Sequence, residues 1–306
     1  MLNGFHGLRL VIAKLTPQWI ELLEMLFGLP LRINFRAYAE NLECGESRDS
    51  TVLRKTRVGY LRMSSVRIDL DRAIVLGITP HGDNSRIVKV LSRSLGVVAL
   101  WVPLGSGKKR QLGMWHPGAL LEISGLQRKG SEGLLRFKEA RRAYLYEQLV
   151  TDVKRSSVAF FLSEVVMKTF PDESAHPELL DLLWETLQNL DTVAQTGWVH
   201  VRFLGQLISH LGLAPTGHLR NERDGLDLQT GEWQQGVFED EDHFGPKLAR
   251  VFVFWTLDSS SLEDPFMLNS EERRKLVLGQ VRYLQHHLSG PRTIKSYEVL
   301  ESVFSS

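Results

Sequence analysis

Short β-rich runs alternate with glycine-containing turns between residues 73 and 146, and this alternation limits the folds open to the chain. The first run, Ala73–Thr79, ends at Pro80 and at the turn residues 81–84. Four further runs follow at 87–91, 97–103, 120–123 and 134–146, with glycines between them. Five short strands within about 80 residues predict a small closed β-barrel of the OB type. Periodicity alone leaves another kind of five-stranded barrel open.

The rest of the chain, residues 151–306, has the pattern of an α-helical unit. Helices are predicted at 153–170, from His176-Pro177 onward, at 198–211, at 248–257, and from a capping box of Asn269 and Glu272 to about His287. A polar, cysteine-free insert at about 214–244 separates the third helix from the fourth, and Thr230-Gly231 predicts a small hairpin in it. The predicted fold class is therefore α+β and multidomain, with an OB-type barrel at 67–150 followed by a helical domain at 151–306.

The first 66 residues have a different pattern from the rest and are predicted to be a poorly structured extension. Their most hydrophobic piece, Trp19–Leu31, is interrupted by Glu21 and Glu24, which excludes a secretory signal. Met63 directly precedes the first convincing strand, so we expect translation to start there and residues 1–62 to be an upstream extension. The alternative is a tether whose amphipathic piece docks on a partner or a membrane surface.

Charge is divided unevenly along the chain. The total of 37 Lys and Arg against 36 Asp and Glu gives +1, which by itself predicts no attraction to nucleic acid. Residues 67–150, however, hold 14 basic and seven acidic residues, a net of +7. Residues 151–306 carry −9 and residues 1–66 carry +3. The total is a cancellation, and the separate values predict DNA as the partner of the barrel and proteins as partners of the helices.

The cations of the barrel form groups that could meet a nucleic-acid backbone. The candidate DNA-binding residues are Arg86, Lys89, Arg93, Lys108, Lys109, Arg110, Arg128, Lys129, Arg136, Lys138, Arg141 and Arg142. Aromatic residues are interleaved with them, namely Trp101, Trp115, Phe137, Tyr144 and Tyr146. Proteins that bind single strands combine a cationic groove with aromatic faces on which bases stack. Trp101 and Phe137 lie in apolar or alternating strands, so for these two residues we expect a place in the core.

Signatures of enzymes, metals and membranes are missing from the sequence. The segment Gly105-Ser106-Gly107-Lys108 is not a nucleotide-binding P-loop, because Val102 and Lys109 stand where glycine and Ser/Thr are needed. The histidines lack metal-ligand spacing, and the acidic run 239–243 lacks the pattern of a calcium loop. We therefore predict no catalytic residue, no metal and no cofactor. The single cysteine, Cys44, fits a reducing cytoplasm, and no run of 18 apolar residues predicts a membrane span.

The serial order of several weak motifs resembles the RecO family of bacterial DNA repair proteins. The motifs are Ala73-Ile-Val-Leu-Gly, His81-Gly-Asp-Asn-Ser, Leu95-Gly, Lys138-Glu-Ala-Arg, Phe160-Phe-Leu-Ser-Glu-Val, Pro177-Glu-Leu-Leu and Lys295-Ser-Tyr-Glu-Val-Leu. The resemblance covers about 70–304 and implies an OB fold packed on a helical domain, without enzymatic turnover. It also implies binding and annealing of single- and double-stranded DNA. Many relatives carry a four-cysteine zinc module where this chain has the insert 214–244, so zinc is not carried over and the hairpin is expected to replace it.

The resemblance further implies protein partners at the bacterial nucleoid. They are RecR, the tail of single-stranded-DNA-binding protein and, indirectly, the recombinase RecA, which the family helps to load. That tail is acidic and ends in an apolar residue, so it needs an apolar groove rimmed by cations. Candidates in the helical domain are Lys154, Arg155, Lys168 and Arg202. Two alternatives stay open: a non-catalytic protein adaptor that does not bind DNA, and a hydrolase with an unrecognised site.

Overall fold

The computed structural model describes residues 66–103, 113–127, 134–170, 174–215, 221, 223–236, 238, 240–257, 267–288 and 293–305. Leu61–Ser306 forms one compact unit, and residues 1–65 lie outside the described residues. The predictions about the extension 1–66, including translation from Met63 and docking of Trp19–Leu31, therefore concern residues that the structure does not describe. Because Leu61–Ser306 forms one unit, the division into domains at residue 150 stays a prediction.

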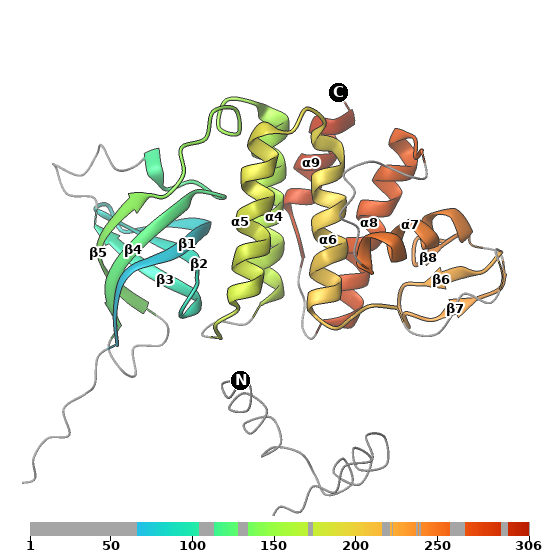
Figure 1. Ribbon diagram of the computed structural model, residues 1–306, viewed down its shortest axis with the longest axis horizontal. Helices are drawn as coiled ribbons and strands as arrows, with labels where there is room; N and C mark the ends of the chain where they lie inside the picture. The colour runs from blue at the N-terminus through green and yellow to red at the C-terminus, as the bar shows by residue number, and fades with distance from the viewer. Residues whose placement is uncertain are drawn as a thin grey trace, which may run out of the picture. The chain divides into compact units, whose positions relative to one another are not determined.

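Five strands close into a barrel in the order β1-β2-β3-β5-β4. They are β1 (Val66–His81), β2 (Ser85–Ser92), β3 (Gly96–Pro103), β4 (Leu120–Gln127) and β5 (Leu134–Arg142) (Figure 1). All neighbours are antiparallel except β3 and β5, which pair in parallel over Ala99–Trp101 and Leu134–Arg136. The predicted five-stranded barrel is confirmed. Strand β1 starts earlier than predicted, at Val66, because alternating charged residues hide its first part from a search for apolar runs.

The two faces of the barrel strands have different surroundings. Side chains such as Val88, Val98 and Leu100 fill the barrel interior. On the outer face, Leu91 and Val97 are fully buried against the helices and belong to the second, larger core. The barrel is therefore packed on the helical part mainly through β1, which contacts α4 and α5, and through one end of β2 and β3.

The helical part consists of six α-helices and one short 3₁₀ turn among the described residues. They are α4 (Val153–Thr169), α5 (Pro177–Thr192), η2 (Thr196–Trp198), α6 (Val199–His210), α7 (Pro246–Thr256), α8 (Ser270–His287) and α9 (Ser296–Ser305). Helices α4 and α5 lie side by side between the barrel and the other helices (Figure 1). Helix α8 begins at the predicted capping box of Asn269 and Glu272. Helix α9, which packs on α4, is not among the predicted helices.

The insert between α6 and α7 folds into a small three-stranded sheet. Its strands are β6 (Gly225–Asp227), β7 (Trp233–Gln234) and β8 (His243–Phe244), in the order β7-β6-β8. The predicted turn at Thr230-Gly231 joins β6 to β7, with Gly231 at a φ of 73°. None of the helices in the described part of the chain has the length and apolar character needed to cross a membrane.

Candidate nucleic-acid interface

The exposed end of the outer barrel face carries a tryptophan in a row of three side chains. In β3, Val98, Leu100 and Val102 point into the barrel, so Trp101 points outward and is 36% exposed. Its register partners are Ile87 on β2 and Arg136 on β5. Paired residues of neighbouring strands project to the same side. The prediction that Trp101 belongs to the core is therefore wrong, and the reason is the strict alternation along β3.

Cations lie beside this row, which we call the Trp101 face together with its neighbours Lys89 and Lys138. Arg86 pairs with Val102, which points into the barrel, so Arg86 lies on the other side of β2, at the same end of the strand. Arg136 and Lys138 are exposed, and Arg86 and Lys89 are partly exposed. Lys89 lies two residues from Ile87 on the same face of β2. Among the described residues, no acid forms an ion pair with Arg86, Arg136 or Lys138. Their charges are therefore available to an anionic ligand.

Arg93, one of the predicted phosphate contacts, joins the barrel to the helices instead. Its Nη1 lies 2.5 Å from Oδ1 of Asp181 on α5, and the same carboxylate oxygen lies 3.3 Å from Nη1 of Arg72. The Arg72 guanidinium also lies over the ring of Trp184, 4.1 Å from its centroid. The guanidinium of Arg93 is thus engaged with a carboxylate at the junction, and its contact with DNA stays a prediction.

The remaining predicted cations of the barrel divide into two groups. Arg141 forms an ion pair with Glu122, and Arg142 donates a hydrogen bond of 3.0 Å to the backbone oxygen of Gly113. Both are exposed, so these contacts leave donors for a phosphate. The second group lies outside the described residues and consists of Lys108, Lys109, Arg110, Arg128 and Lys129. The side chain of Phe137 is not described either.

The four cations predicted to bind the acidic tail are not brought together. Arg155 is only 6% exposed and donates to the backbone oxygens of Leu190 and Val193. That prediction is corrected, because Arg155 holds the end of α5 and cannot reach a ligand. Lys154 and Lys168 are both exposed, but they lie at opposite ends of α4. Arg202 lies on α6, in a small hollow between α5 and α6.

Lys154 borders a different groove, of about 660 Å³, between α4, η2, α8 and α9. Its floor includes the apolar side chains Val277, Leu300 and Phe304, and its rim carries Arg273 and Arg274. The Lys154 ammonium lies 5.8 Å from the ring centroid of Phe304. Glu271 and Glu301 also line the groove, and Glu301 forms an ion pair with Arg274, so Lys154 and Arg273 are the cations that could meet an acidic ligand. Periodicity could not bring them together, because α8 and α9 are far from α4 in sequence. We call this groove the α4/α8/α9 groove.

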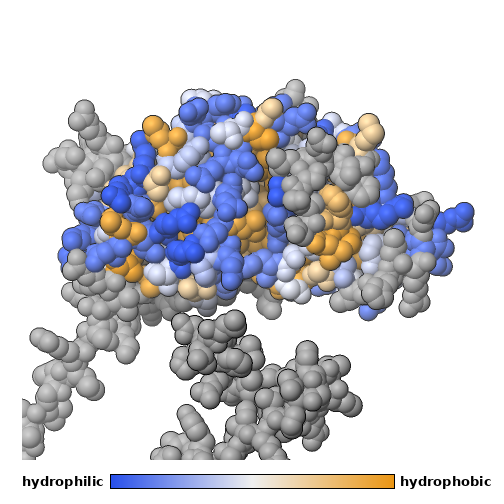
Figure 2. Space-filling model, viewed as in Figure 1, coloured by the Kyte–Doolittle hydropathy of each residue, from blue (hydrophilic) through white to orange (hydrophobic). Residues whose placement is uncertain are grey.

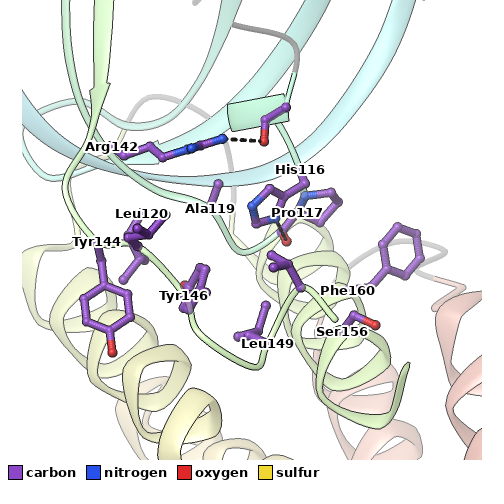
Figure 3. Close-up of a pocket in the computed structure, with 13 residues that line it drawn as sticks. His116, Pro117, Ala119, Leu120, Arg142, Tyr144, Tyr146, Leu149, Ser156 and Phe160 are labelled. Carbon is purple, nitrogen blue, oxygen red and sulfur yellow. Dashed lines mark hydrogen bonds between the residues drawn. The ribbon is translucent and has the colours of Figure 1, made fainter. Parts of the chain in front are cut away.

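An apolar pocket of about 460 Å³ lies where the barrel meets α4 (Figure 3). Leu120, Leu149 and Phe160 are among its walls, and Arg142 lies at its edge. The hydroxyl of Tyr146 donates to the backbone oxygen of Gly118 at 2.6 Å, and burial raises its pKa far above the ordinary value. Tyr146 is thus buried and fixed, and it is not a stacking surface. The exposed Leu145, Val150 and Phe160 make the surroundings of this pocket hydrophobic.

Hydrophobic and hydrophilic side chains share the surface of the described part. In the view of Figure 2, hydrophilic side chains cover most of the visible face and hydrophobic ones form separate patches. Trp115 is 5% exposed and belongs to the barrel core. No group of three or more His, Cys, Asp or Glu in the described ranges is arranged to hold a metal ion.

Two family models together match most of the chain. Residues 63–146 match the model described as "Recombination protein O N terminal", and residues 150–295 match "Recombination protein O C terminal". Curated proteins named DNA repair protein RecO are similar over the same region. That of Flavobacterium psychrophilum is 28% identical over 242 residues, which cover 76% of this chain and 98% of that protein. That of Stenotrophomonas maltophilia is 29% identical over 245 residues, which cover 77% and 98%.

Proposed function

The chain belongs to the RecO family of DNA repair proteins, and from this premise we propose that its barrel binds single- and double-stranded DNA. We propose further that it anneals complementary strands and helps to load a recombinase onto DNA covered by single-stranded-DNA-binding protein. The role is that of a mediator without enzymatic turnover and without a cofactor. It would be exercised in the bacterial cytoplasm, at the nucleoid.

The observation that carries this proposal is the set of cations on the Trp101 face and beside it at the same end of β2. Arg86, Arg136 and Lys138 are without an acidic partner in the described structure, and they lie at the end of the barrel that the helices leave open. Phosphate contacts of Lys and Arg release counterions and supply most of the affinity for a nucleic-acid backbone. The cations at 108–110 and 128–129 belong to the same basic segment of the sequence, residues 67–150. We therefore propose that Arg86, Arg136 and Lys138 contact DNA at this end of the barrel.

Annealing follows from the same charges. Two complementary strands repel one another through their phosphates, and this repulsion is reduced when a cationic surface neutralises part of the charge. A surface that binds backbones without reading base edges lets the bases of both strands search for their partners. The barrel would thus act by lowering the electrostatic cost of strand encounter.

Protein partners are proposed for the helical side of the molecule. The α4/α8/α9 groove offers the acidic tail of single-stranded-DNA-binding protein a floor of Val277, Leu300 and Phe304 and the cations Lys154 and Arg273. The hydrophobic surroundings of the junction pocket, with exposed Leu145 and Val150, suit a larger protein such as RecR. RecA would be reached indirectly, through loading onto DNA that the complex has exposed.

A binding titration of the full chain with labelled DNA tests the proposal. We expect binding to a single strand and to a duplex of equal length, and faster annealing of complementary strands in the presence of the protein. A variant with Lys108, Lys109 and Arg110 changed to Ala should bind more weakly, and its affinity should depend less steeply on salt. A chain that binds RecR but neither form of DNA at about 50 mM salt, where phosphate contacts are strong, would establish the adaptor alternative instead.

A further inference from the structure

We propose that Trp101 is a base-stacking residue, which makes the Trp101 face a site for unpaired nucleobases rather than for nucleic-acid backbone alone. The inference rests on the proposed DNA binding and adds to it the chemical class of the ligand. It predicts that one side chain distinguishes single strands from duplex.

Trp101 is exposed although other outward-facing residues of the same strand are buried under the helices. Three outward residues follow one another along β3, at positions 97, 99 and 101. Val97 is fully buried under the helices, Ala99 is partly buried, and Trp101 is 36% exposed. The helices therefore end short of Trp101. An indole is large and apolar, and exposing it forfeits hydrophobic burial. Tryptophan is enriched at interfaces, where one part of the ring is buried and another meets a partner, and Trp101 has this arrangement.

The row that contains Trp101 combines an aliphatic, an aromatic and a cationic side chain. Trp101 lies between Ile87 on one neighbouring strand and Arg136 on the other, and neighbouring strands are about 4.8 Å apart. An aliphatic side chain on one side and a guanidinium on the other leave the indole as the aromatic surface between them. A base stacked on this indole would place its own phosphate within reach of Arg136 or Lys138. Stacking surface and phosphate contact thus occur on adjacent strands.

Stacking on Trp101 would favour single strands over duplex DNA. In a duplex both faces of each base are covered by neighbouring base pairs, so an indole on a convex barrel surface can touch only the backbone. An unpaired base has a free face, and stacking on an aromatic ring tolerates any of the four bases. The contact therefore favours single strands without sequence preference, and it is lost when the strand pairs with its complement. Annealing would then release the base from Trp101.

The test uses the full chain with a single-stranded oligonucleotide and a duplex of equal length. We expect Trp101→Ala to weaken single-strand affinity between about fivefold and about 150-fold, the range of base–aromatic stacking, and to leave duplex affinity within about twofold. Trp101→Phe should restore part of the single-strand affinity, because it keeps an aromatic face. Leu257→Ala is the control, since it removes a large exposed apolar side chain at the end of α7, outside the Trp101 face, and should leave both affinities unchanged.

A spectroscopic readout separates stacking from a structural effect. Stacked bases quench indole fluorescence, so single-stranded DNA should quench the wild-type chain more strongly than Trp101→Phe, while duplex should quench both equally. Thermal unfolding of each variant establishes that the barrel is intact. If the wild-type chain binds neither DNA, the proposed function itself fails. If it binds both and Trp101→Ala lowers the two affinities equally, or lowers neither, the stacking proposal is overturned while DNA binding stands.

Discussion

The Oδ1 atom of Asp191 accepts a hydrogen bond of 2.7 Å from the backbone N–H of Leu149, which ties α5 to the segment that connects the barrel to α4. The same carboxylate accepts from the backbone N–H groups of Gln148 at 2.8 Å and Glu147 at 3.0 Å. Burial by itself would raise the pKa of Asp191, but these backbone donors outweigh it and hold the pKa below the ordinary value of 3.8. A single buried carboxylate therefore fixes the connection between the two parts of the molecule.

Replacing Asp191 with Asn should destabilise the chain. Asn keeps one acceptor oxygen but loses the charge that strengthens three backbone hydrogen bonds, and we expect a loss of about 2–4 kcal/mol in the free energy of unfolding. Because the folded-state pKa is lowered, the carboxylate stabilises the fold above the unfolded-state pKa, and this contribution is lost as the pH falls through the folded-state pKa. Urea unfolding at pH 7 and pH 3 measures both effects. If the free energies of unfolding of the wild-type chain and of Asp191→Asn differ by the same amount at both pH values, the stabilising role of the Asp191 charge is contradicted.

His200 on α6 should make stability depend on pH in a higher range. Burial, followed by the nearby Arg273, lowers the pKa of His200 to about 4, and its Nδ1 is buried without a hydrogen-bond partner among the described residues. The unfolded chain takes up this proton near pH 6.5, but the folded chain does not, so stability falls as the pH drops from 6.5 toward 4. At about 1.4 kcal/mol per pKa unit, the loss is about 3 kcal/mol.

His200→Leu should remove this dependence, since Leu is apolar and of similar size. Between pH 6.5 and 4.5 we expect the urea midpoint of the variant to fall much less than that of the wild-type chain. His210→Leu, an exposed position of the same helix, is the control and should follow the wild-type curve. Parallel curves for His200→Leu and the wild-type chain would show that His200 is accessible to protons in the folded state.

Much of the fold could be predicted from local patterns. Glycine-bounded apolar runs gave four of the five strands within a few residues, and Pro177 and the Asn269 capping box placed two helix starts. These features act through near neighbours in the chain, which is why sequence alone reveals them. The parallel pairing of β3 with β5 was out of reach, because it joins segments separated by more than 30 residues and has no local signature.

The candidate site was predicted as a set of charges but not as a surface. A cation such as Arg93 is indistinguishable in sequence from Arg136, yet one meets Asp181 across the junction and the other stays exposed. The same holds for Arg155, whose burial depends on the end of α5. Trp101 could have been placed correctly, since the alternation of Val98, Leu100 and Val102 already assigns it to the outer face. Long-range contacts therefore separate structural cations from exposed ones.

Gly205 on α6 should resist replacement by Ala, against the usual preference of helices. Ala in place of Gly stabilises an exposed helix interior by about 1 kcal/mol. A Cβ at Gly205, however, would lie 2.6 Å from the backbone oxygen of Trp255 on α7. The two helices would have to separate, so we expect Gly205→Ala to lower the free energy of unfolding by about 1–3 kcal/mol. Ser209→Ala, exposed on the same helix, should change it by less than about 0.5 kcal/mol.

The insert should hold its shape without a metal ion. Oδ2 of Asp242 accepts from Nε2 of Gln229 at 2.9 Å, and its Oδ1 lies 3.0 Å from Nε2 of His286 on α8. The hydrogen bond with His286, followed by that with Gln229, lowers the pKa of Asp242. Asp242→Ala should therefore speed amide exchange in β6 and β8, whereas a chelator should leave the unfolding temperature of the wild-type chain unchanged. A fall in that temperature on chelation would reveal a structural metal.

The salt dependence of DNA binding should separate exposed cations from paired ones. Arg136→Ala and Lys138→Ala each remove a cation without a described acidic partner, whereas Arg93→Ala removes one that is bound to Asp181. Each lost phosphate contact should reduce the slope of log K against log salt by about 0.9 on duplex and about 0.7 on single strands. We expect this reduction for Arg136→Ala and for Lys138→Ala, and an unchanged slope for Arg93→Ala. Titrations between about 50 and 200 mM salt resolve such differences. Equal reductions for Arg93 and Arg136 would mean that the Asp181 pair opens on binding and that DNA extends to the junction.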